Sequence, residues 1–287
     1  MPTRDKPWTE PLVLKLIERH RGRAAEDIIE RHADQLRRDA EEDGLPVDVG
    51  LIASVEGVKR RRGAWDFAGR IYAESDGQLV MDLNDLDRDE RQRFTCAHEL
   101  MHLAFPGFKK ETRYRLDAKQ PGENSRNAEE EYLCDLGAAA LLMPAGLVKP
   151  VYGISDGLDG IERLARAGQV SLQAAGNRLV ALADQPAAFL VLEWSHKPAD
   201  RPKLRRGEDV PERLRLRYAS AASINAHLPR FKSAADNSVF CRAWHGRRQR
   251  GRELLPGAER LGAFEVEAQA YGRSDRRLVL ALAHQPG

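Results

Sequence analysis

The stretch that decides this fold reads Thr95-Cys-Ala-His-Glu-Leu-Met-His-Leu and contains the pattern His98-Glu99-x-x-His102. Two histidines four residues apart on a helix lie one turn above the other on the same face, where both imidazoles can bind one Zn²⁺ ion. Glu99 can then take a proton from a water molecule at that ion and deliver it to a leaving amine. The stretch therefore predicts a helix with a catalytic zinc site. The alternative is a pair of helix histidines hydrogen-bonded in the core.

A second helix, expected from about residue 125 to residue 143, offers the third zinc ligand. Glu131 and Asp135 are four residues apart and share a helical face. A catalytic zinc takes three protein ligands and keeps one position open, so Glu131 is predicted as the third ligand. Asp135 is predicted to accept the free N–H of one ligand histidine and to fix its tautomer. The alternative is a solvated acidic face that includes Glu129 and Glu130.

The flanking sequence predicts the rest of a mostly helical domain with a small sheet. Apolar residues at helical spacing indicate helices over 9–42 and 47–57, and two short helices within 158–184. Short strands are expected at 70–73 and 78–83. The second could lie inside the sheet or, as an edge strand, pair with an extended substrate. Asp87 is the expected N-cap of the His98 helix, with Glu90 completing a capping box.

The C-terminal hundred residues have a different character. Strands are expected at 188–194, 264–271 and 277–284, which indicates an α+β domain with an antiparallel sheet. We therefore predict a metallopeptidase domain over residues 1–184 and a second domain over 185–287. The pair of helices at 161–183 could be a helix-turn-helix, but its second helix carries only Arg178 as a basic residue. We prefer a pair that completes the peptidase fold.

Charge is distributed unevenly along the chain. Residues 196–252 contain 15 Lys+Arg and 5 Asp+Glu, a balance of +10, whereas the whole chain has 46 and 44, which leaves −8 for the remainder. Arginines neutralise phosphates, and interleaved aromatic rings can stack on unpaired bases. This pattern predicts binding of single-stranded nucleic acid; the alternative is a solvated surface. The candidate residues are Arg205, Arg206, Arg247, Arg248 and Arg250.

Composition excludes several classes of protein. With 42% hydrophobic residues the chain can form a core, and no apolar run approaches the ~18 residues of a membrane span. The N-terminus has no apolar signal core, so we expect a cytoplasmic protein without a membrane partner. Three widely spaced cysteines form no disulfide framework. Cys134 or Cys241 could occupy the open zinc position, although an ordinary buried residue is the simpler interpretation.

Several motifs together resemble the ImmA/IrrE family of metallopeptidases. These are Arg91-Gln-Arg-Phe-Thr-Cys-Ala-His-Glu-Leu-Met-His, then Glu131-x-x-x-Asp135, then Leu141-Leu-Met-Pro144. The resemblance covers roughly residues 45–184. It implies a zincin-like fold, with His98, His102 and Glu131 as zinc ligands and Glu99 as the catalytic residue. It also implies that the substrate is a partner repressor with a helix-turn-helix domain, cleaved after DNA damage or during anti-phage responses.

The C-terminal α+β architecture resembles the IrrE-like branch of that family, which implies a GAF-like sensor domain. The activating signal would be single-stranded DNA or a small molecule. The group that stabilises the oxyanion is expected among the His, Tyr or Arg residues of the 108–124 loop. The alternative function is a non-catalytic nucleic-acid-binding regulator with a structural metal, but such a metal usually has a fourth Cys or His ligand.

Overall fold

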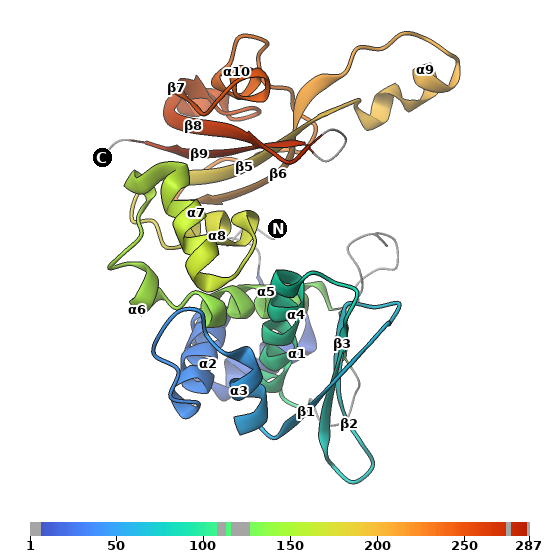
Figure 1. Cartoon of the computed structure of the whole chain (residues 1–287), viewed down its shortest axis with the longest axis vertical. Helices are drawn as coiled ribbons and strands as arrows, with labels where there is room; N and C mark the ends of the chain where they lie inside the picture. The colour runs from blue at the N-terminus through green and yellow to red at the C-terminus, as the bar shows by residue number, and fades with distance from the viewer. Residues whose placement is uncertain (1–6, 108–112, 116–126, 274–276, 286–287) are drawn as a thin grey trace. The chain divides into compact units, whose positions relative to one another are not determined.

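The computed structural model describes residues 7–107, 127–273 and 277–285, and the backbone of 113–115. The fold is mixed α+β, as the sequence predicts, and its elements are labelled in Figure 1. Packing divides the chain into two compact units. Unit 1 comprises Met1–Pro150 with Ala165–Ser171, and unit 2 comprises Val151–Leu164 with Leu172–Gly287. Among the described helices, none has the length and apolarity to cross a bilayer.

Unit 1 is built around two buried helices, α4 (Asp89–Met101) and α5 (Ala128–Leu142), which pack against each other. Gly137 of α5 allows this close approach. A Cβ atom there would lie 2.5 Å from Met101 Sδ of α4 and 2.5 Å from Ile29 Cγ2 of α2. The other helices of the unit are α1 (Pro11–Arg19), α2 (Ala25–Asp39), α3 (Val49–Val55), the short η1 (His102–Ala104) and α6 (Ala145–Val148).

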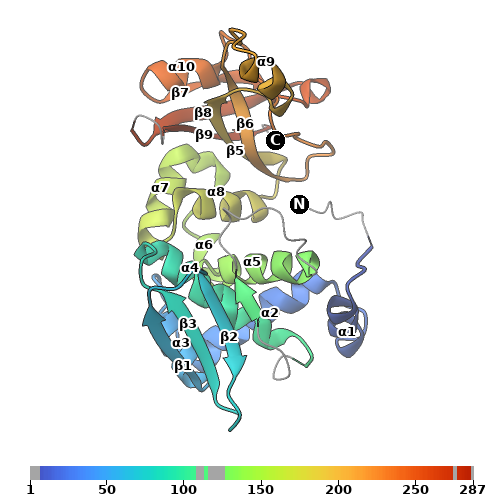
Figure 2. The ribbon, with the colours of Figure 1, turned by 90° about the vertical axis from the view of Figure 1, so that its right-hand side faces the viewer.

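The sheet of unit 1 has four strands in the order β1-β3-β2-β4. They are β1 (Val58–Gly63), β2 (Gly69–Ala73), β3 (Leu79–Asn84) and β4 (Arg113–Arg115). β1 runs parallel to β3, and the other neighbours are antiparallel. Both β2 and β3 contact α4 (Figure 2). The strand predicted at 78–83 is β3, which lies inside the sheet, so the idea that its edge receives a substrate is wrong.

Two local predictions for unit 1 are corrected by the structure. The single helix expected over 9–42 is two helices, because Arg21 and Gly22 have φ values of 57° and 77° and end the first one. Helix α4 begins after Arg88, and Asp87 contacts Arg91 instead of capping the helix. The basic run within β1 forms an edge strand, and charged side chains commonly protect such an edge from pairing.

Unit 2 contains a five-stranded antiparallel sheet in the order β6-β5-β9-β8-β7. The strands are β5 (Ala187–Ser195), β6 (Arg213–Ala222), β7 (Gln249–Leu254), β8 (Ala263–Tyr271) and β9 (Leu278–His284). The sequence predicted β5, β8 and β9. It missed β6 and β7, because both are interrupted by the arginines of the basic block. In β6 the consecutive residues Leu214, Arg215 and Leu216 are buried, and β7 alternates half-buried with exposed residues, which the charge pattern does not reveal.

The two faces of this sheet bear different residues. Alternate residues such as Leu190, Phe264 and Val266 pack with Phe240 of α10 (Val239–His245) in one apolar core. On the opposite face, Phe189 packs against Gly176 of α8 (Leu172–Ala181). The remaining helices are η3 (Ile154–Asp156), α7 (Gly157–Gly168), η4 (Pro198–Asp200), α9 (Arg201–Arg205) and η5 (Glu259–Leu261).

The limits of the units differ from the predicted domain limits. Contacts such as that between Phe189 and Gly176 place α8 in the same unit as the C-terminal sheet. Unit 2 therefore begins at Val151, before the predicted limit at residue 184. The predicted functional domains, residues 1–184 and 185–287, are a separate assignment based on the family resemblance. Both those limits and the GAF-like character of the second domain stay predictions.

Candidate metal centre

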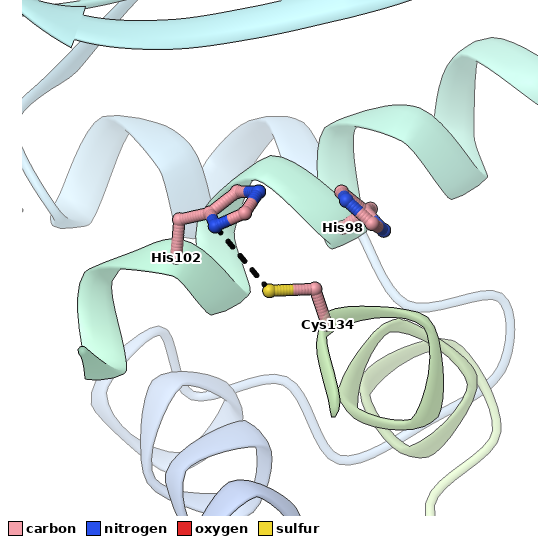
Figure 3. Close-up of side chains that lie close together, drawn as sticks. All are labelled: His98, His102 and Cys134. Carbon is pink, nitrogen blue, oxygen red and sulfur yellow. Dashed lines mark hydrogen bonds between the residues drawn. The ribbon is translucent and has the colours of Figure 1, made fainter. Parts of the chain in front are cut away.

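His98 and Glu99 of α4, and His102 at the start of the following η1, lie in the interior of unit 1. Their exposed fractions are 1%, 0% and 0%. The two imidazole rings come from adjacent turns, with their centroids 5.2 Å apart (Figure 3). The neighbouring Ala97, Leu100 and Met101 are fully buried as well. Burying three ionisable side chains among apolar residues is costly unless each is partnered.

Helix α5 supplies a carboxylate to the same nitrogen of each ring. Asp135 Oδ1 lies 2.9 Å from His98 Nδ1, and Glu130 Oε1 lies 3.0 Å from His102 Nδ1. A carboxylate accepts hydrogen bonds, so these contacts assign the ring proton of each neutral imidazole to Nδ1. The Nε2 atom of each ring is then the lone-pair nitrogen that can bind a metal.

Glu131 faces both Nε2 atoms. Its carboxylate oxygens lie 3.2 Å from His98 Nε2 and 3.8 Å from His102 Nε2. A carboxylate thus lies opposite the ring nitrogens that are left without a proton, and these three groups are donors of the kind that zinc binds.

The donor set fits a divalent cation. His102 Nε2 is buried and has no hydrogen-bond partner within the described part of the chain. Four carboxylates, those of Glu99, Glu130, Glu131 and Asp135, surround the two imidazoles. A cation between the Nε2 atoms and Glu131 would satisfy His102 and offset this negative charge.

Glu99 lies where α4 meets the first residue of β2. That residue is Gly69, and a Cβ atom on it would be 3.4 Å from Glu99 Oε1 and 2.4 Å from Thr95 Cγ2. Real Cβ atoms do not approach carbon this closely, so the helix can lie against the strand only because residue 69 is glycine. The strand thereby helps to fix the Glu99 side chain beside the histidine pair.

Cys134 provides an alternative third ligand. The ligand atoms of His98, His102 and Cys134 all lie within 4.8 Å of one another. However, Cys134 Sγ lies 3.4 Å from Nδ1 of His102, the nitrogen that faces Glu130 (Figure 3). Burial first, and then the surrounding carboxylates, raise the pKa of the Cys134 thiol well above its usual value. Metals bind the thiolate, so this geometry favours Glu131 over Cys134.

The structure thus brings His98, Glu99, His102, Glu131 and Asp135 together, as the sequence predicts. Glu130 was missed, because the sequence presents it within a run of three glutamates. One signal could have found it. The buried residues Glu130, Leu133, Cys134, Gly137 and Ala138 follow each other at helical spacing and define the buried face of α5. The 108–124 loop proposed to stabilise the oxyanion lies outside the described side chains.

The five candidate arginines of the basic block fall into two groups. Arg205, Arg206 and Arg247 are exposed, and Arg206 pairs with Glu208 at 2.7 Å. The half-buried Arg248 and the exposed Arg250 belong to an ion-pair network within unit 2. Phosphate groups would have to compete with carboxylates for these two side chains.

Two other candidates occupy the interior. Cys241 is 6% exposed and packs in the core formed with α10, which fits an ordinary buried residue. Arg178, the basic residue of the second helix in the candidate helix-turn-helix, is 4% exposed. A side chain buried to this extent is not available to a DNA phosphate, so α7 and α8 are better explained as structural helices.

Comparison with known proteins supports the assignment of this segment. Residues 58–180 match the IrrE N-terminal-like domain of M78 peptidases. The chain is 39% identical over 112 residues to the radiation response metalloprotease IrrE of Deinococcus deserti. That alignment covers 38% of this chain and 37% of the relative, so the match spans little more than a third of either protein.

A solved structure shows a similar fold over most of the chain. It is a transcriptional regulator of Mycobacterium tuberculosis, with a TM-score of 0.57 and 13% sequence identity. The likeness covers 95% of this chain and 80% of that protein. At this identity the comparison concerns the fold alone.

Proposed function

Because residues 58–180 belong to the ImmA/IrrE family of metallopeptidases, we propose that this protein is a zinc-dependent endopeptidase with Glu99 as its catalytic residue. His98, His102 and Glu131 would hold the metal. The observation that carries this proposal is the pair of buried imidazoles whose Nδ1 atoms face carboxylates while both Nε2 atoms face Glu131. Two ordinary core histidines would need hydrogen-bond partners, but they would not need both Nε2 atoms to face one carboxylate.

Each residue of the site has a distinct task in this proposal. The bound metal would supply a Lewis acid that activates water and polarises the scissile carbonyl. Glu99 accepts a proton from the attacking water and donates it to the leaving amine nitrogen. Asp135 holds the Nδ1–H of His98 and so keeps that ring in one tautomer. The apolar wall of α4 limits water access to the carboxylate of Glu99.

The substrate is proposed to be a repressor with a helix-turn-helix domain. This follows from the family resemblance of the motifs around His98 and Glu131, and cleavage would release stress or anti-phage genes from repression. The alternative is a non-catalytic nucleic-acid-binding regulator with a structural metal. The geometry disfavours that alternative, because Glu99 lies beside three proposed ligands, and the nearby Cys134 sulfur contacts Nδ1 of His102, the nitrogen that faces away from Glu131.

The activating signal is proposed to be single-stranded DNA bound by exposed arginines of the basic block. Arg205 and Arg247 are the residues with which we would test this, because they are exposed, whereas Arg206, Arg248 and Arg250 already contact carboxylates. Binding to labelled oligonucleotides should weaken steeply between ~50 and ~200 mM salt. Absence of binding at the lower salt would leave a small molecule or a protein as the signal.

The peptidase proposal is tested by co-expressing the chain with the product of a neighbouring helix-turn-helix gene and looking for a defined cut. The Glu99→Gln variant should retain the metal and the fold but cleave ~10²–10⁴-fold more slowly, because an amide cannot accept the proton of water. Normal cleavage by this variant would show that Glu99 is misassigned. A metal-loaded protein that cuts no such partner would support the regulator.

A further inference from the structure

Glu130 is fully buried beside the proposed metal centre. Its exposed fraction is 0%, whereas the adjacent Glu131 keeps 33% of its side chain exposed. A carboxylate in the interior needs a hydrogen-bond donor or a positive charge to compensate for lost hydration. Nδ1 of His102 is a donor to Glu130, at 3.0 Å from Oε1.

We propose that Glu130 is a positioning residue for His102, an inference that rests on the proposed metallopeptidase function. Its carboxylate accepts the Nδ1–H and thereby keeps Nε2 as the lone-pair nitrogen that faces Glu131. Cys134 Sγ lies 3.4 Å from the same Nδ1, but a thiol is a weaker acceptor than a carboxylate. Glu130 therefore does for His102 what Asp135 does for His98.

The turn of α5 that carries Glu130 is held by residues near the N-terminus of the chain. The carboxylate of Glu10 accepts the backbone N–H groups of Glu129 and Glu130, at 2.8 and 3.0 Å. In return, the carboxylate of Glu129 accepts the backbone N–H groups of Thr9 and Glu10, at 2.9–3.0 Å and 2.8 Å.

These reciprocal contacts satisfy two first-turn N–H groups of α5 and the N–H groups of the two residues that precede α1. They also fix the backbone from which Glu130 and Glu131 project. Thr9 and Glu10 precede the segment matched to the family, which begins at residue 58. The support of the site in this chain therefore extends beyond the matched segment.

The first test measures zinc affinity of the full chain by competition with a chromogenic chelator. Glu130→Ala should weaken zinc binding ~10–100-fold, the usual cost of removing a carboxylate that orients a ligand histidine. Glu130→Gln keeps an acceptor oxygen at the same place and should recover much of this loss. Glu90→Gln is the control, because it removes one negative charge from the exposed N-terminal end of α4 and no contact to His102. Circular dichroism checks that each variant folds.

The second test uses the zinc-free protein, so it does not depend on metal binding or peptidase activity. With ¹⁵N-labelled histidines, NMR should show His98 and His102 both protonated at Nδ1 in the wild type. Glu130→Ala should change the tautomer of His102 alone, and Asp135→Ala that of His98 alone. If Glu130→Ala does not fold, Glu130→Gln should still shift the Nδ1 proton of His102 upfield, since its hydrogen bond is weaker.

The outcomes separate the two proposals. An unchanged His102 tautomer, or zinc affinity within about threefold of the wild type in folded Glu130→Ala, would overturn the role of Glu130. If the wild type binds no zinc, the metallopeptidase proposal fails, and the tautomer measurement alone decides whether Glu130 positions His102. If zinc binding falls as expected but no peptide is cut, Glu130 keeps its role and the catalytic proposal fails.

Discussion

The protein buries carboxylates in two regions and compensates for them in different ways. In unit 1, acidic side chains of α5 surround the imidazoles of His98 and His102. In unit 2, Arg248 meets Asp159, Glu162 and Glu267, and its Nε donates to Gln269 Oε1 at 2.7 Å. The first region pairs anions with imidazole rings, which can also bind a metal, whereas the second pairs them with a permanent cation.

The network of unit 2 is complete without a ligand. Glu267 accepts the N–H of Leu158 at 2.8 Å, at the start of α7, and two N–H groups of Arg250 at 2.9 and 3.0 Å. The Tyr271 hydroxyl donates to Glu162 Oε1 at 2.6 Å. Gly157 has a φ of +63°, and a Cβ atom there would lie 1.9 Å from Glu267 Oε2, so only glycine permits this cap.

A ligand-binding site and a structural network differ in whether all their polar groups have hydrogen-bond partners. Each donor and acceptor just described in unit 2 has a partner of the opposite kind. The network thereby holds the start of α7 against the sheet. The cluster in unit 1 leaves the Nε2 atom of His102 without a hydrogen-bond partner in the described structure and facing a carboxylate at 3.8 Å. We expect the first region to change when metal is removed and the second to be unaffected.

The largest effect is expected when a proposed metal ligand is removed from the first region. Glu131→Gln should weaken zinc binding by more than ~100-fold, beyond the usual cost of losing a residue that only orients a ligand. Cys134→Ser should leave zinc binding within about threefold, because its sulfur lies on the Nδ1 side of His102. Metal analysis and chelator competition measure both. The reverse result would assign the site to His98, His102 and Cys134.

A smaller effect is expected from breaking the second region. Arg248→Met should destabilise unit 2 by about 1–3 kcal/mol, because it removes charge-assisted hydrogen bonds to partly buried carboxylates. Arg247→Met is the matched control, since Arg247 is exposed and should change stability by less than ~0.5 kcal/mol. Chemical unfolding followed by tryptophan fluorescence compares the two. Equal free energies of unfolding for the two variants would show that the network does not stabilise unit 2. The zinc content of both variants should equal that of the wild type.

The smallest expected effect is on the pH dependence of the free energy of unfolding of unit 2. Burial, followed by the hydrogen bond to Glu162, raises the pKa of Tyr271. An unfolded tyrosine ionises near pH ~10, so the stability from Tyr271 is fully present below that pH and is lost as pH rises toward the folded pKa. Stability of the wild type should therefore fall more steeply above pH ~10 than that of Tyr271→Phe. Parallel curves of unfolding free energy against pH would contradict this assignment.

The helix that carries His98 and the helix that carries Glu131 could both be predicted from the sequence alone. The spacing of His98 and His102 places both rings on one face, and Glu131 and Asp135 share a face in the same way, because the period of the α-helix is fixed. The α+β class and three strands of the second sheet followed from apolar alternation. These features depend on residues close in sequence, for which local geometry is sufficient.

The contacts between side chains from distant segments could be identified only from the tertiary structure. Glu130 reads as one charge in an acidic run, and its burial follows from the packing of α5 against α4, where Gly137 allows close contact. Likewise, Arg248 reads as part of a basic surface, but the fold brings residues Asp159 and Glu162 to it from more than 80 positions away. Charge is visible in a sequence, whereas the partner that compensates it depends on contacts between distant segments.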